Sequence, residues 1–389
     1  MRIAVAYDCL FPWSKGGGER LYRTLAEEFA AAGHEVTYLT RQQWDDQPEL
    51  DWMDLTVVSH DRHLYDVNGT RTLGPAVRFG RGLFRHLRRN RETYDAVLVS
   101  ATPATNVLAV RAALAGSAVV IAVDWLEVWR ADQWREYAGP FVGGAANVLQ
   151  RLAIRLSPLA TVHSRLVARR LRERGLAAEP VISPGLIDRD GCTEPSLTIP
   201  APPRVVYIGR HIPDKHVESL PAAIAYARRE IPDLEATIFG DGPTRDAVRA
   251  EVDRLGLGEV VRLPGFVSQD DIDEGLRTAA CLVNPSTREG YGLVVVESCA
   301  AGTPVVLVDA DDNAAVELVD DGVNGHIARS LAPDALGTSI VDVVTAGESM
   351  RRTTHAWFTE ASRTRTVQAT ARQIVTRLEQ AVAQGHVRA

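Results

Sequence analysis

The sequence has 389 residues, of which 46% are hydrophobic and 24% are charged; this composition is typical of a globular protein with two domains of ordinary size. The formal net charge of −7 argues against a nucleic-acid-binding protein. Neither a run of 18 apolar residues nor a signal-peptide pattern is present, so we expect a cytoplasmic protein. The cysteines have no metal-ligand or redox spacing, and we expect no metal site.

The first 193 residues alternate between expected strands and helices, followed by a proline-rich linker at 194–203. Strands are expected at 2–7, 35–40, 55–58, 95–100, 118–123 and 180–183, with one further strand-and-helix unit at 159–174. After the linker, strands are expected at 204–209, 236–240, 260–263, 281–283, 304–309 and 325–328. Apolar strands that alternate with helices predict an α/β fold of two doubly wound parallel sheets, with domains at 1–193 and 204–360 that face each other across a cleft.

Glycines follow the first strand, where Gly16, Gly17 and Gly18 open a helix that runs to about Ala32. Their spacing is not that of a dinucleotide fingerprint. Glycines let a backbone approach a ligand closely; a flexible surface loop is the alternative interpretation. Lysine, a compact charge that suits phosphate, occurs only beside this loop as Lys15 and after the first strand of the second domain as Lys215.

Two further segments of the first domain are candidate sites. Asp124 follows the expected strand at 118–123, where side chains project toward a ligand crevice. It is a candidate catalytic residue on the acceptor side, and a helix cap is the alternative. The arginine-rich stretch from Arg78 to Arg91 suits peripheral contact with an anionic membrane, although a solvated helix is the plainer interpretation.

Candidate anion ligands lie after two strands of the second domain. Arg210 and Lys215 follow the strand at 204–209 and suit a diphosphate, because each charge-assisted bond contributes about 1.5–3 kcal/mol. A surface loop salt-bridged through Asp214 is the alternative. Glu289 precedes the helix that begins near Gly292, and Glu297 lies about two turns inside it. Both carboxylates then address the helix N-terminus, which favours an anion; a capping Glu289 with an arginine-paired Glu297 is the alternative.

These motifs resemble those of the retaining glycosyltransferases of family 4, which have the GT-B fold of two Rossmann-like domains. The resemblance spans nearly the whole chain and is carried by Gly209-Arg210 with Lys215, by Gly240-Asp241-Gly242, and by Glu289 with Glu297 in Arg-Glu-Gly-Tyr-Gly-Leu-Val-Val-Val-Glu. It implies transfer of a sugar from a nucleoside-diphosphate donor, with UDP as the first expectation, to an acceptor hydroxyl. It also implies that the final helix, about 361–389, packs back on the first domain.

The resemblance assigns a role to each matching residue. Arg210 and Lys215 would hold the diphosphate, Glu297 the ribose, and Glu289 the donor sugar as a catalytic residue. The remaining donor contacts would be Gly17, Gly18, Gly242, Val267, Gly290, Tyr291, Gly292, Leu293 and Val294. No cofactor beyond the donor substrate is expected, and leaving-group stabilisation would not need a metal.

One departure concerns a histidine that the family commonly carries near the end of the strand at 118–123. No histidine occurs between Val123 and Glu127, so Asp124 or Leu126 takes that place. Two alternative functions stay open at this point. One is a GT-B epimerase of nucleotide sugars, and the other is a catalytically inactive partner subunit that binds a nucleotide sugar.

Overall fold

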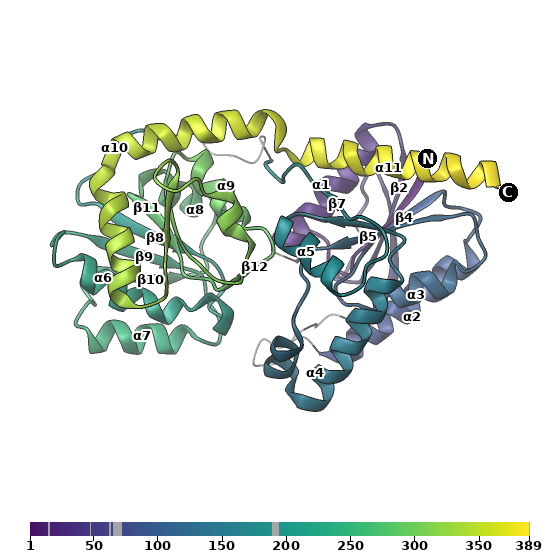
Figure 1. The fold of residues 1–389 in the computed structure, drawn as a ribbon, viewed down its shortest axis with the longest axis horizontal. Helices are drawn as coiled ribbons and strands as arrows, with labels where there is room; N and C mark the ends of the chain where they lie inside the picture. Colours follow the sequence, from purple (N-terminus) through teal and green to yellow (C-terminus); the bar gives the residue numbers. More distant parts are fainter. Residues whose placement is uncertain (15, 47, 62–63, 65–71, 189–193, 389) are drawn as a thin grey trace. The chain divides into compact units, whose positions relative to one another are not determined.

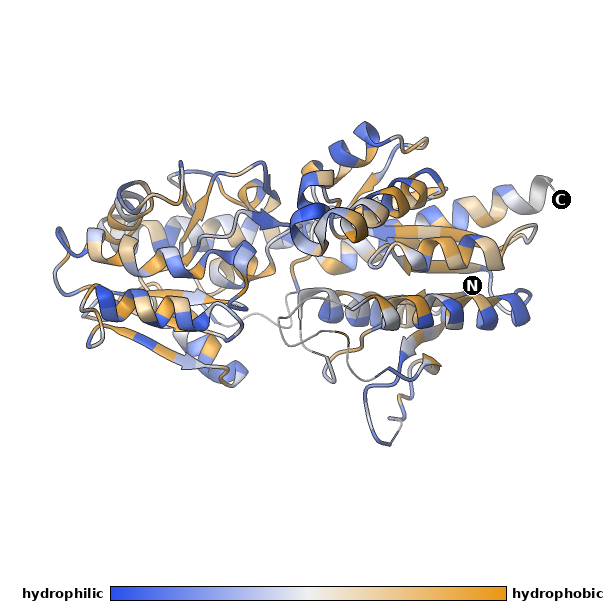
Figure 2. Ribbon diagram, turned by 90° about the horizontal axis from the view of Figure 1, so that it is seen from below, coloured by the Kyte–Doolittle hydropathy of each residue, from blue (hydrophilic) through white to orange (hydrophobic). Residues whose placement is uncertain are grey.

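A computed structural model describes residues 1–14, 16–46, 48–61, 64, 72–188 and 194–388. The chain divides into two compact units, of which unit 1 comprises Met1–Leu186 with Arg365–Ala389 and unit 2 comprises Ile187–Thr364 (Figure 1). Hydrophobic residues concentrate in the strands of each sheet (Figure 2). In the described part of the chain, no helix is both long and apolar enough to cross a membrane.

Unit 1 contains a parallel seven-stranded sheet with the order β3-β2-β1-β4-β5-β6-β7. Its strands are β1 (Arg2–Ala6), β2 (Glu35–Arg41), β3 (Asp54–Ser59), β4 (Ala96–Ser100), β5 (Val120–Trp125), β6 (Leu159–Val162) and β7 (Val181–Ile182). Its helices are α1 (Gly17–Ala31), α2 (Leu73–Arg89), α3 (Thr105–Ala113), α4 (Ala131–Arg155), α5 (Arg165–Glu173) and α11 (Val367–Arg388). Helices α2 to α5 share one apolar core with the sheet, while α1 packs against β2 and α11.

Unit 2 contains a parallel six-stranded sheet with the order β10-β9-β8-β11-β13-β15, and a two-stranded pair of β12 with β14. Its strands are β8 (Arg204–Ile208), β9 (Glu235–Phe239), β10 (Val261–Gly265), β11 (Cys281–Asn284), β12 (Arg288–Glu289), β13 (Val305–Val308), β14 (Asp312–Asn313) and β15 (Gly325–Ala328). Its helices are α6 (Leu220–Ala227), α7 (Arg245–Arg254), α8 (Gln269–Thr278), α9 (Leu293–Ala300) and α10 (Pro333–Thr364), with short 3-10 turns at Pro213–Lys215, Val217–Ser219 and Ala314–Leu318.

These sheets confirm the two doubly wound α/β domains expected from the alternating pattern. Each sheet has one point at which the chain reverses its direction of winding, between β1 and β4 in unit 1 and between β8 and β11 in unit 2. Open α/β sheets bind ligands outside the carboxyl ends of the strands at such a point. The fold therefore directs attention to the loops that follow β1 and β4, and to those that follow β8 and β11.

The proline-rich segment is held by unit 2 and is not a free linker. The Ser196 N–H donates to the Ala301 carbonyl at 3.0 Å, and the Ser196 carbonyl accepts from the buried Arg351 guanidinium at 2.7 Å. The same guanidinium donates to the Arg277 carbonyl at 2.8 Å. The units therefore change over at Leu186, ahead of this segment. The last helix begins at Val367, later than the expected 361, because α10 continues to Thr364.

Candidate functional site

In unit 2, the loops after β8 and β11 meet at the carboxyl edge of the sheet. Strands β8 and β11 are parallel neighbours, with Val205 beside Cys281 and Val206 beside Leu282. The Thr287 N–H donates to the Asp214 carbonyl at 3.2 Å. Residues more than 70 positions apart in the sequence are thereby brought to one place.

Lys215 and Glu289 form an ion pair across these two loops, from Nζ to Oε1. The Asn284 side-chain amide donates to the same carboxylate oxygen at 3.2 Å. Both side chains are mostly buried, with 21% of the lysine and 15% of the glutamate side chain exposed. Lys215, which was expected to bind the diphosphate, and Glu289, which was expected to bind the sugar, thus neutralise each other.

A second ion pair stabilises the same junction. The Arg288 guanidinium pairs with the Asp214 carboxylate, and the Ser286 hydroxyl donates to the Asp214 carbonyl at 3.3 Å. The alternative interpretation, a surface loop salt-bridged through Asp214, is therefore correct for Asp214 itself. Its partner is Arg288, whereas Lys215 pairs with Glu289.

The Gly240-Asp241-Gly242 turn packs directly against the loop after β8. A Cβ on Gly240 would lie 1.9 Å from the Gly209 carbonyl oxygen, and one on Gly242 would lie 2.4 Å from the His211 carbonyl oxygen. The His211 N–H donates to the Asp241 carbonyl at 2.9 Å. The pKa of Asp241 is lowered, mainly by the hydrogen bond from the Gly242 N–H and to a lesser extent by the Arg245 guanidinium. Glycine is thus needed here for close packing of the loops that carry the site.

Helix α9 begins at the same edge and has no side-chain cap among the described residues. Its N-cap is Gly292, with φ +105°, and a Cβ there would lie 2.6 Å from the Ala315 Cβ. The interpretation of Glu289 as the helix cap is therefore wrong, since Glu289 pairs with Lys215. Glu297 is half-buried, as are the first-turn residues Leu293 and Val294.

The remaining expected donor residues of unit 2 follow strands β8, β10 and β12. Gly290 and Tyr291 join β12 to α9, and Val267 follows β10 and packs against the core cluster that contains Val295. Arg210 follows β8, and its carbonyl accepts from the Tyr207 hydroxyl at 3.1 Å. Burial, and then the charge of Glu289, raise the pKa of Tyr207, so this hydroxyl stays protonated as a donor.

In unit 1, the glycine loop lies against an aromatic pair. Gly17 opens α1, and a Cβ on Gly18 would lie 2.9 Å from the Tyr7 hydroxyl oxygen. The Tyr7 ring stacks on the Tyr22 ring, with centroids 4.3 Å apart. Lys15 lies outside the described residues.

Asp124 is placed differently from the expectation. It lies inside β5, because that strand continues to Trp125, and it has no exposed surface. The interpretations of Asp124 as a helix cap and as a side chain projecting into a crevice are both wrong. Its carboxylate accepts from the hydroxyls of Tyr22 at 2.7 Å and Thr161 at 2.6 Å, and His163 Nε2 lies 3.0 Å from it.

The sequence interpretation missed His163 because it follows β6, one strand away from the position at which the family histidine was expected. Strands β5 and β6 pair with Asp124 beside Thr161. His163, two positions beyond Thr161, therefore lies next to the end of β5. The only local signal was a histidine directly after an apolar strand, Val162-His163-Ser164.

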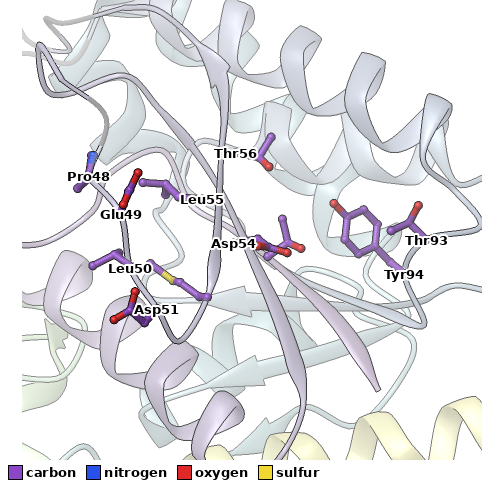
Figure 3. Close-up of a pocket in the computed structure, with 11 residues that line it drawn as sticks. Pro48, Glu49, Leu50, Asp51, Asp54, Leu55, Thr56, Thr93 and Tyr94 are labelled. Atoms are coloured by element: carbon purple, nitrogen blue, oxygen red, sulfur yellow. The ribbon is translucent and has the colours of Figure 1, made fainter.

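The pocket drawn in Figure 3 lies elsewhere in unit 1. It has a volume of about 540 Å³ and is lined by Thr37, Asp54 and Tyr94, among others. Asp54 begins β3 and Tyr94 precedes β4, so the pocket lies at the amino edge of the sheet. Because open parallel sheets bind ligands at the opposite edge, we do not assign it to the candidate site. Among the described residues, no group of His, Cys, Asp and Glu is arranged to hold a metal ion.

Two family patterns match the chain. The glycosyl transferases group 1 pattern matches residues 194–356, and the glycosyl transferase 4-like domain pattern matches residues 16–185. The two matches therefore cover most of both units.

Curated relatives match shorter segments. The chain is 30% identical over 135 residues, 34% of its length and 26% of the relative's, to the GtfA subunit of the UDP-N-acetylglucosamine–peptide N-acetylglucosaminyltransferase of Streptococcus gordonii. It is 35% identical over 156 residues, 39% of its length and 34% of the relative's, to the D-inositol 3-phosphate glycosyltransferase of Mycolicibacterium gilvum. These matches span less than two thirds of either relative.

Solved structures are similar over nearly the whole chain. Sucrose-phosphate synthase from Thermosynechococcus elongatus superposes with a TM-score of 0.79 at 19% identity, covering 98% of this chain and 99% of that one. HepE from Anabaena, solved in complex with UDP, superposes with a TM-score of 0.74 at 18% identity, covering 98% and 100%. These similarities establish the fold.

Proposed function

Since the chain belongs to the group 1 glycosyltransferases and has the GT-B fold, we propose that it transfers a sugar from a nucleoside-diphosphate donor to an acceptor hydroxyl with retention of anomeric configuration. The observation that carries this proposal is the Lys215–Glu289 pair at the winding reversal of unit 2, beside the start of α9. UDP is the first candidate nucleotide, and the solved complexes of HepE with UDP and UDP-glucose support that choice.

In this proposal, donor binding separates the ion pair. The diphosphate takes Lys215, together with Arg210 and the N–H groups of Leu293 and Val294, while the freed Glu289 turns to the sugar. As the glycosidic bond breaks, negative charge grows on the diphosphate and positive charge grows on the sugar. Preorganised charges of opposite sign stabilise both. The leaving phosphate accepts the proton of the attacking hydroxyl, and protein cations serve where other enzymes use a metal.

The remaining donor contacts follow from the same arrangement. Glu297, on α9, would bind the ribose, and the backbone at Val267 would line the base. Gly17 and Gly18 would approach the diphosphate with their backbones, because no side chain stands between a glycine and its ligand.

Melting shifts with a panel of nucleoside diphosphates and their sugars test the proposal. We expect one nucleotide series to raise the melting temperature and its sugar to be transferred to an added acceptor. Product analysis by NMR then reports the anomeric configuration. Conversion of the donor without an acceptor would favour an epimerase, and binding without any turnover would favour an inactive partner subunit.

We also propose that unit 1 contacts the surface of an anionic membrane, which would bring a lipid-linked acceptor to the enzyme. In α2, Leu83 and Leu87 are buried. Leu73 and Val77 instead point outward, being 60% and 58% exposed. The segment from 73 to 91 contains six arginines and no acidic residue.

Helix α4 extends this surface. Beyond the kink at Gly139 and Pro140, it exposes 90% of Phe141 and 64% of Val148. Helices α2 and α4 both contact α3 on one side of the sheet. No acidic residue occurs between 137 and 172, so the surface complements an anionic headgroup.

Sedimentation with phosphatidylglycerol vesicles at low and moderate salt tests this contact. We expect binding that Phe141→Ser weakens about tenfold or more and that the matched change Phe266→Ser, at a 75% exposed residue of unit 2, leaves unchanged. No co-sedimentation at low salt would overturn the proposal. Concentration-dependent dimers that Phe141→Ser abolishes would instead assign the surface to a second copy of the chain.

A further inference from the structure

Five buried side chains of unit 1 form a continuous row from β7 to the glycine loop. The Ser183 hydroxyl lies 3.0 Å from His163 Nδ1, and His163 Nε2 lies 3.0 Å from the Asp124 carboxylate. Asp124 accepts from the Tyr22 hydroxyl, and Tyr22 stacks on Tyr7. All five are buried.

The chemistry of Asp124 fixes the direction of these bonds. A carboxylate only accepts hydrogen bonds, so the hydroxyls of Tyr22 and Thr161 and the Nε2–H of His163 all donate to it. Burial raises the pKa of Asp124, but the imidazole of His163 and the two hydroxyls lower it by more than that. The carboxyl group is therefore ionised. Charge-assisted bonds of this kind are short and directional. Asp124 therefore holds the Tyr22 ring in one orientation.

Tyr22 is directly connected to the glycine loop. It lies on α1, one helical turn after Gly18. Its stacking partner Tyr7 places a hydroxyl oxygen where a Cβ on Gly18 would be only 2.9 Å away. The Tyr7 hydroxyl therefore packs closely against Gly18, so a shift of the Tyr7–Tyr22 pair would displace the start of α1.

We propose that His163 and Asp124 are positioning residues, which hold the Gly17–Gly18 backbone through Tyr22 and Tyr7 and so set the affinity for the donor diphosphate. This inference rests on the proposed function, because it assigns the loop to the donor. His163 and Asp124 do not touch the substrate. Their contribution is made to the binding of the donor and not to the chemical step.

The variant Tyr22→Phe tests this with the smallest change, because it removes the hydroxyl and keeps the stacked ring. Tyr94→Phe is its matched control in unit 1. Tyr94 is also buried, and its hydroxyl pairs with a histidine, His86, at 2.8 Å, but it precedes β4 at the amino edge of the sheet. We expect Tyr22→Phe to raise the donor KM and the Kd for UDP about tenfold with kcat within about twofold, and Tyr94→Phe to change neither.

A rescue experiment keeps the inference testable if Tyr22→Phe folds poorly. Gly18→Ala should weaken UDP binding, because its methyl group overlaps the Tyr7 hydroxyl. Adding Tyr7→Phe removes that oxygen and should restore part of the affinity. Melting temperatures are measured alongside, since a purely structural network would lower them without separating KM from kcat.

The outcomes distinguish the two proposals. If the wild-type chain binds none of UDP, GDP and ADP, the proposed function fails and this inference falls with it. If the wild type binds UDP but Tyr22→Phe has the same KM, kcat and Kd as Tyr94→Phe, the proposed function stands and the positioning role is overturned. Lack of rescue by Tyr7→Phe would likewise refute the connection to Gly18.

Discussion

Lys215→Ala is expected to weaken UDP binding through two effects that the structure separates. The first is the lost contact with the diphosphate. One charge-assisted bond contributes about 1.5–3 kcal/mol, which corresponds to a roughly 10- to 150-fold increase in Kd. The second effect comes from Glu289, which pairs with Lys215.

Without Lys215, the Asn284 amide, at 3.2 Å, is the one hydrogen-bond partner that the Glu289 carboxylate keeps among the residues that the structure describes. It is 15% exposed, so water screens it weakly, and its negative charge then opposes the incoming diphosphate. Neutralising it should relieve that repulsion. The double variant Lys215→Ala with Glu289→Gln is therefore expected to bind UDP more tightly than Lys215→Ala alone.

Isothermal titration calorimetry with UDP measures all three proteins at one salt concentration. Arg204→Ala is the matched control, since Arg204 pairs with Glu235 at 2.9 Å with 30% and 23% exposure, at the amino edge of the same sheet. We expect its Kd to equal that of the wild type. Equal UDP affinity in Lys215→Ala and the wild type would refute the role of Lys215, and a double variant weaker than Lys215→Ala would refute the repulsion argument.

Three further results are expected. Glu289→Gln should lower kcat by roughly a hundredfold or more without weakening donor binding, whereas Glu297→Gln should chiefly raise the donor KM. Steady-state kinetics measure kcat and KM, and calorimetry measures donor affinity separately. If both variants changed donor binding and left kcat unchanged, this assignment would be wrong. Gly292→Ala should lower the free energy of unfolding by about 1–2 kcal/mol or more, because φ at Gly292 is +105°. Gly258→Ala is the control, since the space around its Cβ is open, and it should change the free energy of unfolding by less than about 0.5 kcal/mol. Urea titrations measure both variants. Burial raises the pKa of Asp124, but an imidazole and two hydroxyls outweigh it and depress that pKa. The contribution of Asp124 to stability is therefore present above the ordinary carboxyl pKa of about 4 and is lost as the pH falls through the depressed value. The stability of Asp124→Asn should depend less on pH below about 4 than that of the wild type, and parallel stability curves for the two proteins would contradict the assignment.

The local pattern was sufficient to predict the two sheets. Each strand of unit 2 that the sequence indicated is present, because a run such as 281–283 is apolar throughout and suits a strand that is covered on both faces. The two-residue strands β12 and β14 were not predicted, since their pairing joins segments that have no periodicity of their own. The residue types of Lys215 and Glu289, a cation and a carboxylate next to strand ends, were also sufficient to make both residues candidates for the site.

Only the tertiary structure decided what those residues contact. Lys215 and Glu289 were predicted as separate ligands, yet they are a pair joined across 74 positions of sequence. Asp124 was predicted to project from a strand end, yet it is buried and bonded to Tyr22 and His163, which are 102 and 39 positions away. Such partners are set by the order of strands in the sheet, which places β5 beside β6 and β8 beside β11. A periodic pattern determines which face of a segment is buried, but the neighbour that buries it comes from the packing of distant segments.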